Sequence, residues 1–141
     1  MVTLAGIKWN RFVQKHKNNN NLHYLGTTVL SNEYGKTLSA AKIGLGLLSK
    51  WIPELHTTRT LEIPACATAL VTEKNTDTES IFNDSEVIFY NNTNHLVNEV
   101  ITYLANDTLL AEKTKNGHQK VINGLFSYEQ IMTNILQQIN N

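Results

Sequence analysis

The stretch KIGLGLLSKWIPELHTTRTLEIPACATALVT, residues Lys42–Thr72, predicts the centre of the fold. It opens with the apolar run Lys42–Leu48 and closes with a second apolar run, Thr68–Thr72. Runs that are apolar on both faces are typical of strands inside a parallel sheet. Between them a polar loop leads into a short helix, predicted over Thr57–Ala67. The stretch is therefore interpreted as a strand–helix–strand unit.

The same alternation extends to both sides of this unit. Further strands and helices are predicted, in chain order, at Val2–Ala5, Trp9–Lys17 (helix), Leu22–Gly26, Asn32–Ala41 (helix), Asp77–Phe82 (helix, capped by Asp77) and Glu86–Tyr90. Strands alternating with helices indicate right-handed βαβ units. We therefore expect an α/β fold: a Rossmann-like three-layer domain with a parallel sheet of about five strands.

The pattern becomes wholly helical after Tyr90. A helix with the apolar stripe Leu96, Val97, Val100, Ile101 and Leu104 comes first, and a helix capped by Asp107 that reaches about Ile122 follows. Ser127 and Gln130 form a capping box for the last helix, whose residues Ile131, Ile135 and Ile139 are expected to face inward.

Composition limits the class of protein. The 141 residues suit a single domain, placed here at 1–141 without an internal boundary, and 41% are hydrophobic. Twelve basic residues balance 12 acidic ones, so nothing in the overall charge favours nucleic acid or a membrane surface. The single cysteine, Cys66, allows no internal disulfide. Without a signal peptide or a transmembrane segment in the sequence, we expect a cytoplasmic protein.

The polar loop before the predicted helix has the chemistry of an anion site. In open parallel sheets, ligands bind at the carboxyl ends of the strands, and this loop follows such an end. Thr57 or Thr58 offers a helix N-cap, and a helix N-terminus favours phosphate. Arg59 would add a planar donor that matches phosphate oxygens. Pro64 is expected to delay the start of this helix or to kink it near Ile63, because proline lacks the backbone N–H.

Glu54 and Glu62 flank these phosphate-type donors. Carboxylate oxygens accept hydrogen bonds from hydroxyl groups, as on a ribose or a sugar. On one helix their Cα atoms would be about 12 Å apart, too far to share one metal ion but suited to an extended ligand such as a nucleotide sugar. Composition alone favours a plainer explanation, in which Glu62 complements the helix dipole, Arg59 is a solvated surface charge and Glu54 is a loop carboxylate.

These residues resemble a known family. The segment YGKTLSAAKIGLGLLSKWIPELHTTRTLEIPACATALVTE is similar to the donor-binding half of GT-B group 1 glycosyltransferases, and most of all to the spore-maturation CgeB-like branch. Glu54 and Glu62 have the spacing of that donor-site motif, in which seven residues separate two glutamates. The resemblance covers about Leu22–Ile139, and it implies a hexosyltransferase-type enzyme that needs neither metal nor cofactor.

The resemblance also implies roles for single residues. Glu62 would bind the ribose of the donor, and Glu54, the one catalytic candidate, would face the donor sugar. Further substrate-binding candidates lie around the diphosphate or the base: His56, Thr57, Thr58 and Arg59 in the motif, and Gly6, Lys8, Arg11 and Thr27 nearer the N-terminus. Lys8 and Arg11 are placed there by their position after the first strand.

The chain departs from the family pattern in three ways. Leu55–Thr57 replaces the glycine that often follows the first glutamate, and Ala67 stands where a glycine is usual. Met1 lies where the second domain of such an enzyme would begin, so the acceptor domain is expected to be missing and the isolated chain inactive. A nucleotide or nucleotide-sugar binding module without catalysis remains an alternative. A receiver-like interaction domain ranks last, because Gly6, Lys8 and Arg11 replace its acidic cluster.

Overall fold

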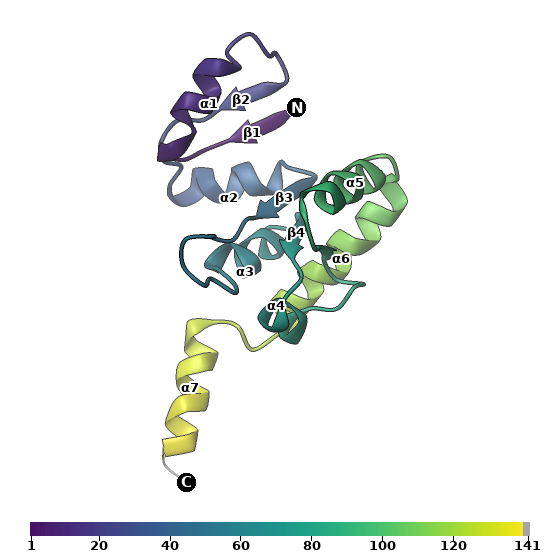
Figure 1. Cartoon of the computed structure of the whole chain (residues 1–141). Coiled ribbons are helices and arrows are strands. Elements are labelled where there is room, and N and C mark those ends of the chain that lie inside the picture. The colour runs from purple at the N-terminus through teal and green to yellow at the C-terminus, as the bar shows by residue number, and fades with distance from the viewer. Residues whose placement is uncertain (140–141) are drawn as a thin grey trace. The chain divides into compact units, whose positions relative to one another are not determined.

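The computed structural model describes residues 1–139 and divides the chain into two compact units, residues 1–37 and residues 38–141. Each unit is described by itself, and Figure 1 labels most of the helices and strands. Every strand pairing between residues 1 and 139 is parallel. None of the helices in this range is long and apolar enough to cross a membrane.

The first unit contains a small βαβ motif. Strand β1 (Val2–Leu4) pairs in parallel with β2 (Leu22–Tyr24), and the crossover carries the 3-10 helix η1 (Ile7–Trp9) and helix α1 (Asn10–Lys15). The predicted strand–helix–strand order of this region is therefore confirmed. Helix α2 (Ser31–Ser39) spans the border between the two units.

The second unit contains a three-stranded parallel sheet in the order β3-β4-β5. Strand β3 covers Ile43–Gly46, β4 covers Ala69–Glu73 and β5 covers Ile88–Tyr90. The five predicted strands are thus all present, hydrogen-bonded as one sheet of two strands and one of three. The helices of this unit are α3 (Thr58–Ala65), α4 (Thr76–Ile81), α5 (Thr93–Leu104), α6 (Asp107–Asn123) and α7 (Tyr128–Ile139).

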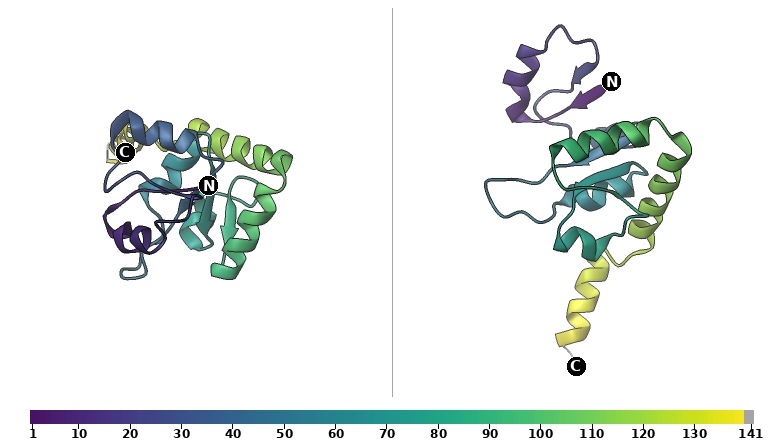
Figure 2. Two further views of the ribbon diagram at one scale, coloured as in Figure 1. Left: turned by 90° about the horizontal axis from the view of Figure 1, so that it is seen from above. Right: turned by 45° about the vertical axis from the view of Figure 1, so that its right-hand side comes forward.

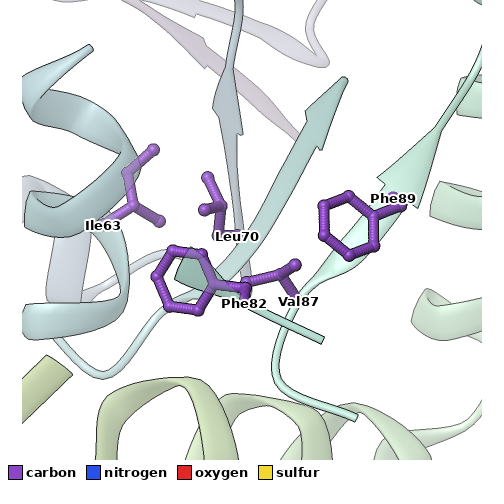
Figure 3. Close-up of a cluster of buried hydrophobic side chains, with 5 residues drawn as sticks. All are labelled: Ile63, Leu70, Phe82, Val87 and Phe89. Atoms are coloured by element: carbon purple, nitrogen blue, oxygen red, sulfur yellow. The ribbon is translucent and has the colours of Figure 1, made fainter. Parts of the chain in front are cut away.

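Both faces of β4 and β5 are buried, as apolar strands predict. The prediction of an interior strand is wrong for β3, which lies at the edge of this sheet and leaves Leu45 45% exposed. On one face Leu70, Val87 and Phe89 pack against Ile63 of α3 and against Phe82, at the end of α4 (Figure 3). On the other face a second cluster joins strand residues to α5 and α6: Ala69, Val71, Ile88, Tyr90 and Leu110, with Leu96, Val100 and Tyr103 packed against it. This gives the three-layer, Rossmann-like arrangement expected of alternating strands and helices.

Gly44 allows α3 to lie close to β3. A Cβ atom built on Gly44 would be 2.7 Å from Cγ2 of Ile63. Any larger residue at position 44 would therefore push the helix away, which explains the glycine at this buried position. Gly44 thus helps to place α3, and with it the polar stretch that precedes the helix.

Helix α6 runs past the amino ends of β3, β4 and β5 (Figure 2). Lys42, just before β3, pairs with Asp107 at 2.7 Å. His118 Nδ1 lies 2.9 Å from the carbonyl oxygen of Pro64, in the helix that leads to β4, and Asn116 donates a hydrogen bond of 3.2 Å to the carbonyl of Ser85, before β5. These contacts cover the amino edge of the sheet and leave the carboxyl edge to the loops that follow the strands.

Three local predictions are wrong. The first is the late start of α3, because this helix begins at Thr58 and includes Pro64; the alternative, a kink near Ile63, stays a prediction. The N-cap of α4 is Asn75 rather than Asp77, and the N-cap of α6 is Asn106 rather than Asp107. In both cases the N-cap is an asparagine one or two positions before the aspartate, and its side-chain oxygen accepts from the free backbone N–H groups of the helix. The aspartate then lies in the first turn of the helix.

The last helix also differs from expectation. Its capping box is confirmed, since Ser127 Oγ accepts from the Gln130 amide at 3.2 Å and Gln130 Oε1 accepts from the Ser127 amide at 3.3 Å. However, Ile131, Ile135 and Ile139 do not face inward, because they are 41%, 44% and 72% exposed. The prediction followed the apolar period of the helix, which shows only that one face is apolar and not that this unit covers it.

Candidate functional site

The candidate site lies at the carboxyl ends of β3 and β4 in the second unit. A loop leaves β3 after Gly46 and ends at Thr57, the N-cap of α3. Beside it, β4 ends at Glu73 and α4 begins at Thr76. The carboxyl edge of a parallel sheet is where α/β proteins of this architecture bind ligands, and the motif residues from Glu54 to Glu62 all lie here or on α3.

The N-terminus of α3 has the features of an anion site. Thr57 is extended, with φ −136° and ψ 171°, and its backbone N–H donates to Oγ1 of Thr60 at 3.1 Å. The Thr60 amide in turn donates to the Thr57 carbonyl at 2.9 Å. The first N–H groups of a helix have no partner within it and carry a partial positive charge. The Thr57–Thr58 start therefore presents donors to the carboxyl edge of the sheet.

Two buried hydroxyl groups lie on this side of the sheet. Among the described side chains, Oγ1 of Thr72 has no hydrogen-bond partner, and Oγ1 of Thr57 faces the Thr60 amide in a capping box, although the hydrogen bond of that amide goes to the Thr57 carbonyl. Thr72 alternates with Leu70 along β4, so both side chains point to the face that α3 covers. An unsatisfied buried hydroxyl costs about 1–3 kcal/mol. Such groups are therefore uncommon, and both hydroxyls belong to the elements that form the candidate site.

The two glutamates of the motif lie on different elements. Glu54 is in the loop, half-buried, and its Oε2 accepts a hydrogen bond of 2.7 Å from the backbone N–H of Ser49. Glu62 is half-buried on α3, where its side chain already has an interaction within the chain. Because Glu54 precedes the helix, the separation expected for two residues on one helix does not apply to this pair.

The basic candidates of the motif are exposed. Arg59 lies in the first turn of α3, and its Nη2 is 3.5 Å from the carbonyl oxygen of Leu47. Nδ1 of His56 lies 3.1 Å from Oδ2 of Asp77. Thr58 is exposed at the first position of the helix. The structure thus brings the motif residues His56–Arg59 together at one helix end.

Two further contacts hold the loop to β4 and α4. Lys50 pairs with Glu73, and this hydrogen bond raises the pKa of the Lys50 ammonium group. The side-chain amide of Asn75 donates a hydrogen bond of 2.9 Å to the carbonyl of Leu55. Glu73 is in register with Tyr90 of β5, and burial, followed by the charge of Glu73, raises the pKa of the Tyr90 phenol.

Sequence reasoning missed this role of Asn75 and Lys50. It treated Asp77 as the cap of the next helix. An asparagine just before Thr76–Ile81 is a recognisable N-cap signal, and it could have identified Asn75 as the cap. The contact with Leu55, 20 residues earlier, has no signal in the local sequence.

The remaining four candidates lie in the first unit. Gly6 follows β1 with φ 127°, and its carbonyl accepts a 2.9 Å hydrogen bond from the hydroxyl of Tyr24. Lys8 on η1, Arg11 on α1 and Thr27 after β2 are all exposed. Within this unit, Gly6 also donates through its amide to the carbonyl of Gly26 at 3.0 Å, so the chain segments after β1 and β2 lie side by side.

No metal centre is visible in the part of the chain that the structure describes. Between Met1 and Ile139, no three or more His, Cys, Asp or Glu side chains form a group that could hold a metal ion. The candidate site offers hydrogen-bonding groups and charge from the helix N-terminus, the threonine hydroxyls, the two glutamates and Arg59.

Several solved structures have the same fold as this chain. The chain is similar to Anabaena Alr3699/HepE in complex with UDP, with a TM-score of 0.78 and 14% identity over 98% of this chain and 40% of that one. Sucrose-phosphate synthase from Thermosynechococcus elongatus matches with a TM-score of 0.72 and 18% identity over 98% of this chain and 37% of that one. This chain therefore spans about two fifths of the length of these proteins.

A single domain gives a further comparison. The C-terminal domain of the glycosyl transferase group 1 family protein LpcC from Francisella tularensis matches with a TM-score of 0.60 and 16% identity, over 81% of this chain and 58% of that one. The comparison with curated proteins finds no match. The model of the glycosyl transferase-like family matches residues 1–137. By that match over almost its whole length, the chain belongs to the glycosyl transferase-like family.

Proposed function

We propose that the second unit binds the diphosphate of a nucleotide-diphosphate sugar at the N-terminus of α3, as the donor-binding domain of a glycosyltransferase. The observation that carries this proposal is the start of α3: the first N–H donors of the helix, Arg59 in the first turn and the buried hydroxyl of Thr57 meet at the carboxyl edge of the sheet. The similarity to a structure that contains UDP supports the same ligand class.

The two glutamates would recognise the hydroxyl-bearing ends of the donor. Glu62 on α3 would accept hydrogen bonds from the ribose, and Glu54 would face the sugar. To do so, Glu54 would exchange its bond to the Ser49 amide for one to the ligand. That exchange is inexpensive, because the backbone N–H of Ser49 lies in a loop that water can reach.

The reaction would be glycosyl transfer to an acceptor held by a separate domain. The bond between the anomeric carbon and the diphosphate oxygen would break, and a bond to an acceptor oxygen would form as its proton leaves to a base. Charge that develops on the leaving diphosphate would be stabilised by the α3 N-terminus and Arg59. Membership of the CgeB-like branch of group 1 enzymes is part of this proposal.

The test is calorimetric titration of the chain with UDP, GDP and ADP and with their sugar conjugates. We expect one nucleotide to bind, and Glu62→Ala to weaken it by about 1–3 kcal/mol through the loss of a buried polar partner. Glu112→Ala, an exposed glutamate on α6, is the matched control and should bind as the wild type does. Binding that Glu62→Ala leaves unchanged would refute the ribose role, and no binding by any nucleotide would refute the proposal for this chain.

The candidates of the first unit are proposed on the sequence alone, Lys8 and Arg11 by their position after the first strand. Lys8 and Arg11 would each add positive charge for a phosphate, and Gly6 and Thr27 would contribute backbone or hydroxyl groups. Lys8→Ala and Arg11→Ala test the charge separately, with Lys15→Ala, another exposed basic residue of α1, as the control. Equal affinities for the three variants would remove Lys8 and Arg11 from the site.

A further inference from the structure

Residues at the end of β4 and the start of α4 contact the loop that precedes α3. Lys50 pairs with Glu73, His56 lies 3.1 Å from Asp77, and the carbonyl of Leu55 accepts a 2.9 Å bond from Asn75. All three contacts reach the loop from a five-residue segment, Glu73–Asp77. The position of the α3 N-terminus therefore depends on the segment between β4 and α4 as well as on the packing of α3 itself.

Of these contacts, the one made by Asn75 has the best-defined geometry. Its Oδ1 accepts from the amides of Asp77 and Thr78, at 3.0 Å each. The backbone N–H of Asn75 donates to Oγ1 of Thr78 at 3.1 Å, and the fully buried Thr78 hydroxyl donates to the Glu73 carbonyl. With the oxygen committed to two donors, the side-chain nitrogen can only face the loop, so the direction of the bond to Leu55 is set.

The contacts made by Lys50 and His56 are weaker constraints. The side chains of Lys50 and His56 are 73% and 51% exposed. Side-chain contacts at this exposure contribute little, because water competes for the polar groups. The neutral bond from Asn75 reaches the backbone itself, two residues before the N-cap Thr57, and so acts directly on where α3 begins.

We propose that Asn75 is a positioning residue for the donor site: its side chain caps α4 and, through the Leu55 carbonyl, holds the loop in the place that presents the α3 N-terminus to a diphosphate. This inference rests on the proposed function for its ligand. A shift of an ångström in such a donor array weakens binding even though the residue that moved it touches no ligand. Asn75 therefore acts through Leu55 and Thr57 rather than by contact with the nucleotide.

The test uses Asn75→Ser in the full chain. Serine keeps an N-cap oxygen for α4 and adds no charge, but it removes the donor to Leu55. Asn106→Ser is the matched control, because Asn106 caps α6 through a 3.0 Å bond from the Leu109 amide and lies at the amino edge of the sheet. Two readouts are needed: amide hydrogen exchange of residues 49–57 without ligand, and dissociation constants for UDP and uridine by calorimetry.

We expect Asn75→Ser to exchange amide hydrogens faster over residues 49–57 than the wild type and Asn106→Ser do. We also expect about threefold to tenfold weaker UDP binding, the range that one lost hydrogen bond produces, and a smaller loss for uridine, which lacks the diphosphate. Unchanged exchange would overturn the inference whether or not UDP binds. Faster exchange with an unchanged dissociation constant for UDP would overturn the positioning role while the proposed function stands. If the wild type binds no nucleotide, the proposed function fails and this role fails with it.

Discussion

Gly117 of α6 lies directly against the backbone of Glu86, just before β5. A Cβ atom built on Gly117 would be 2.4 Å from the carbonyl oxygen of Glu86 and 3.7 Å from Cβ of Pro64. The only residue that lets α6 pass this close to the amino edge of the sheet is therefore glycine, although glycine is a poor helix former.

Replacing Gly117 should destabilise the protein. The Gly117→Ala substitution gains helix propensity but places a methyl group on a backbone oxygen that cannot move aside, and overpacking of this kind costs about 1–3 kcal/mol. Urea denaturation measures the change. Gly35→Ala on α2 is the control, because a Cβ there meets no described atom within 4 Å, and this variant should be neutral or stabilised. A stabilised Gly117→Ala would contradict the close approach.

Lys113 should contribute to stability despite its charge. It is only 8% exposed, its ammonium group donates to the Asp84 carbonyl, and it lies 5.2 Å from the centre of the Tyr103 ring. Lys113→Met keeps the apolar stem but leaves the carbonyl without this donor, which should cost about 1–3 kcal/mol in the free energy of unfolding. Lys115→Met, at an exposed position of the same helix, should change it little. Equal effects would show that the buried bond contributes nothing.

Arg59 should discriminate between ligands with and without phosphate. If Arg59 contacts the diphosphate, Arg59→Ala should weaken the binding of UDP by about tenfold, in the range for a charge-assisted hydrogen bond. The affinity for uridine, which has no phosphate, should be almost unchanged. Arg59→Lys should recover part of the loss, since lysine keeps the charge without the planar pair of donors. Lys115→Ala serves as the charge-matched control. Equal losses for UDP and uridine would assign Arg59 a structural role instead.

Tyr90 should make folding stability fall at alkaline pH. Burial, and secondly the charge of Glu73, raises the pKa of Tyr90 above its ordinary value of 10.0, while Lys50 acts in the opposite direction. The stabilisation is therefore fully present below about pH 10 and is lost as the pH rises through the folded pKa, because the unfolded state releases its proton first. Denaturation of the wild type and Tyr90→Phe near neutral pH and above about pH 10 measures this. The free energy of unfolding of the wild type, relative to that of Tyr90→Phe, should be lower at the higher pH. A difference that does not change with pH would contradict the raised pKa of Tyr90.

The isoleucines of α3 and α7 should respond very differently to truncation. Ile63 is 1% exposed in the core, so Ile63→Ala should cost about 2–5 kcal/mol. Ile135 is 44% exposed, and Ile135→Ala should change the free energy of unfolding by about 0.5 kcal/mol or less. Thermal or urea denaturation compares the two. A large cost at Ile135 would mean that α7 packs against this unit in solution.

Much of the fold could be predicted because its signals are local. The apolar runs at Lys42–Leu48 and Thr68–Thr72 became parallel neighbours in β3 and β4, and the capping box at Ser127 formed as its spacing indicates. The cap of α6 was misplaced by one residue, because aspartate and asparagine cap helices equally well and the choice between Asn106 and Asp107 depends on backbone angles. The helix start before Pro64 was misjudged because tertiary packing outweighed the one lost hydrogen bond.

Some features of the candidate site likewise follow from the local sequence, and others arise only from tertiary packing. By itself, the sequence determined the strand–loop–helix order and the spacing of Glu54 and Glu62, since these follow from neighbours along the chain. Only the tertiary structure decided that α6 covers the amino edge of the sheet, that the apolar face of α7 is exposed, and that Asn75 reaches the loop at Leu55. The physical reason is that periodicity shows which face of an element is apolar, whereas burial and hydrogen bonds between distant residues arise only when the elements pack together.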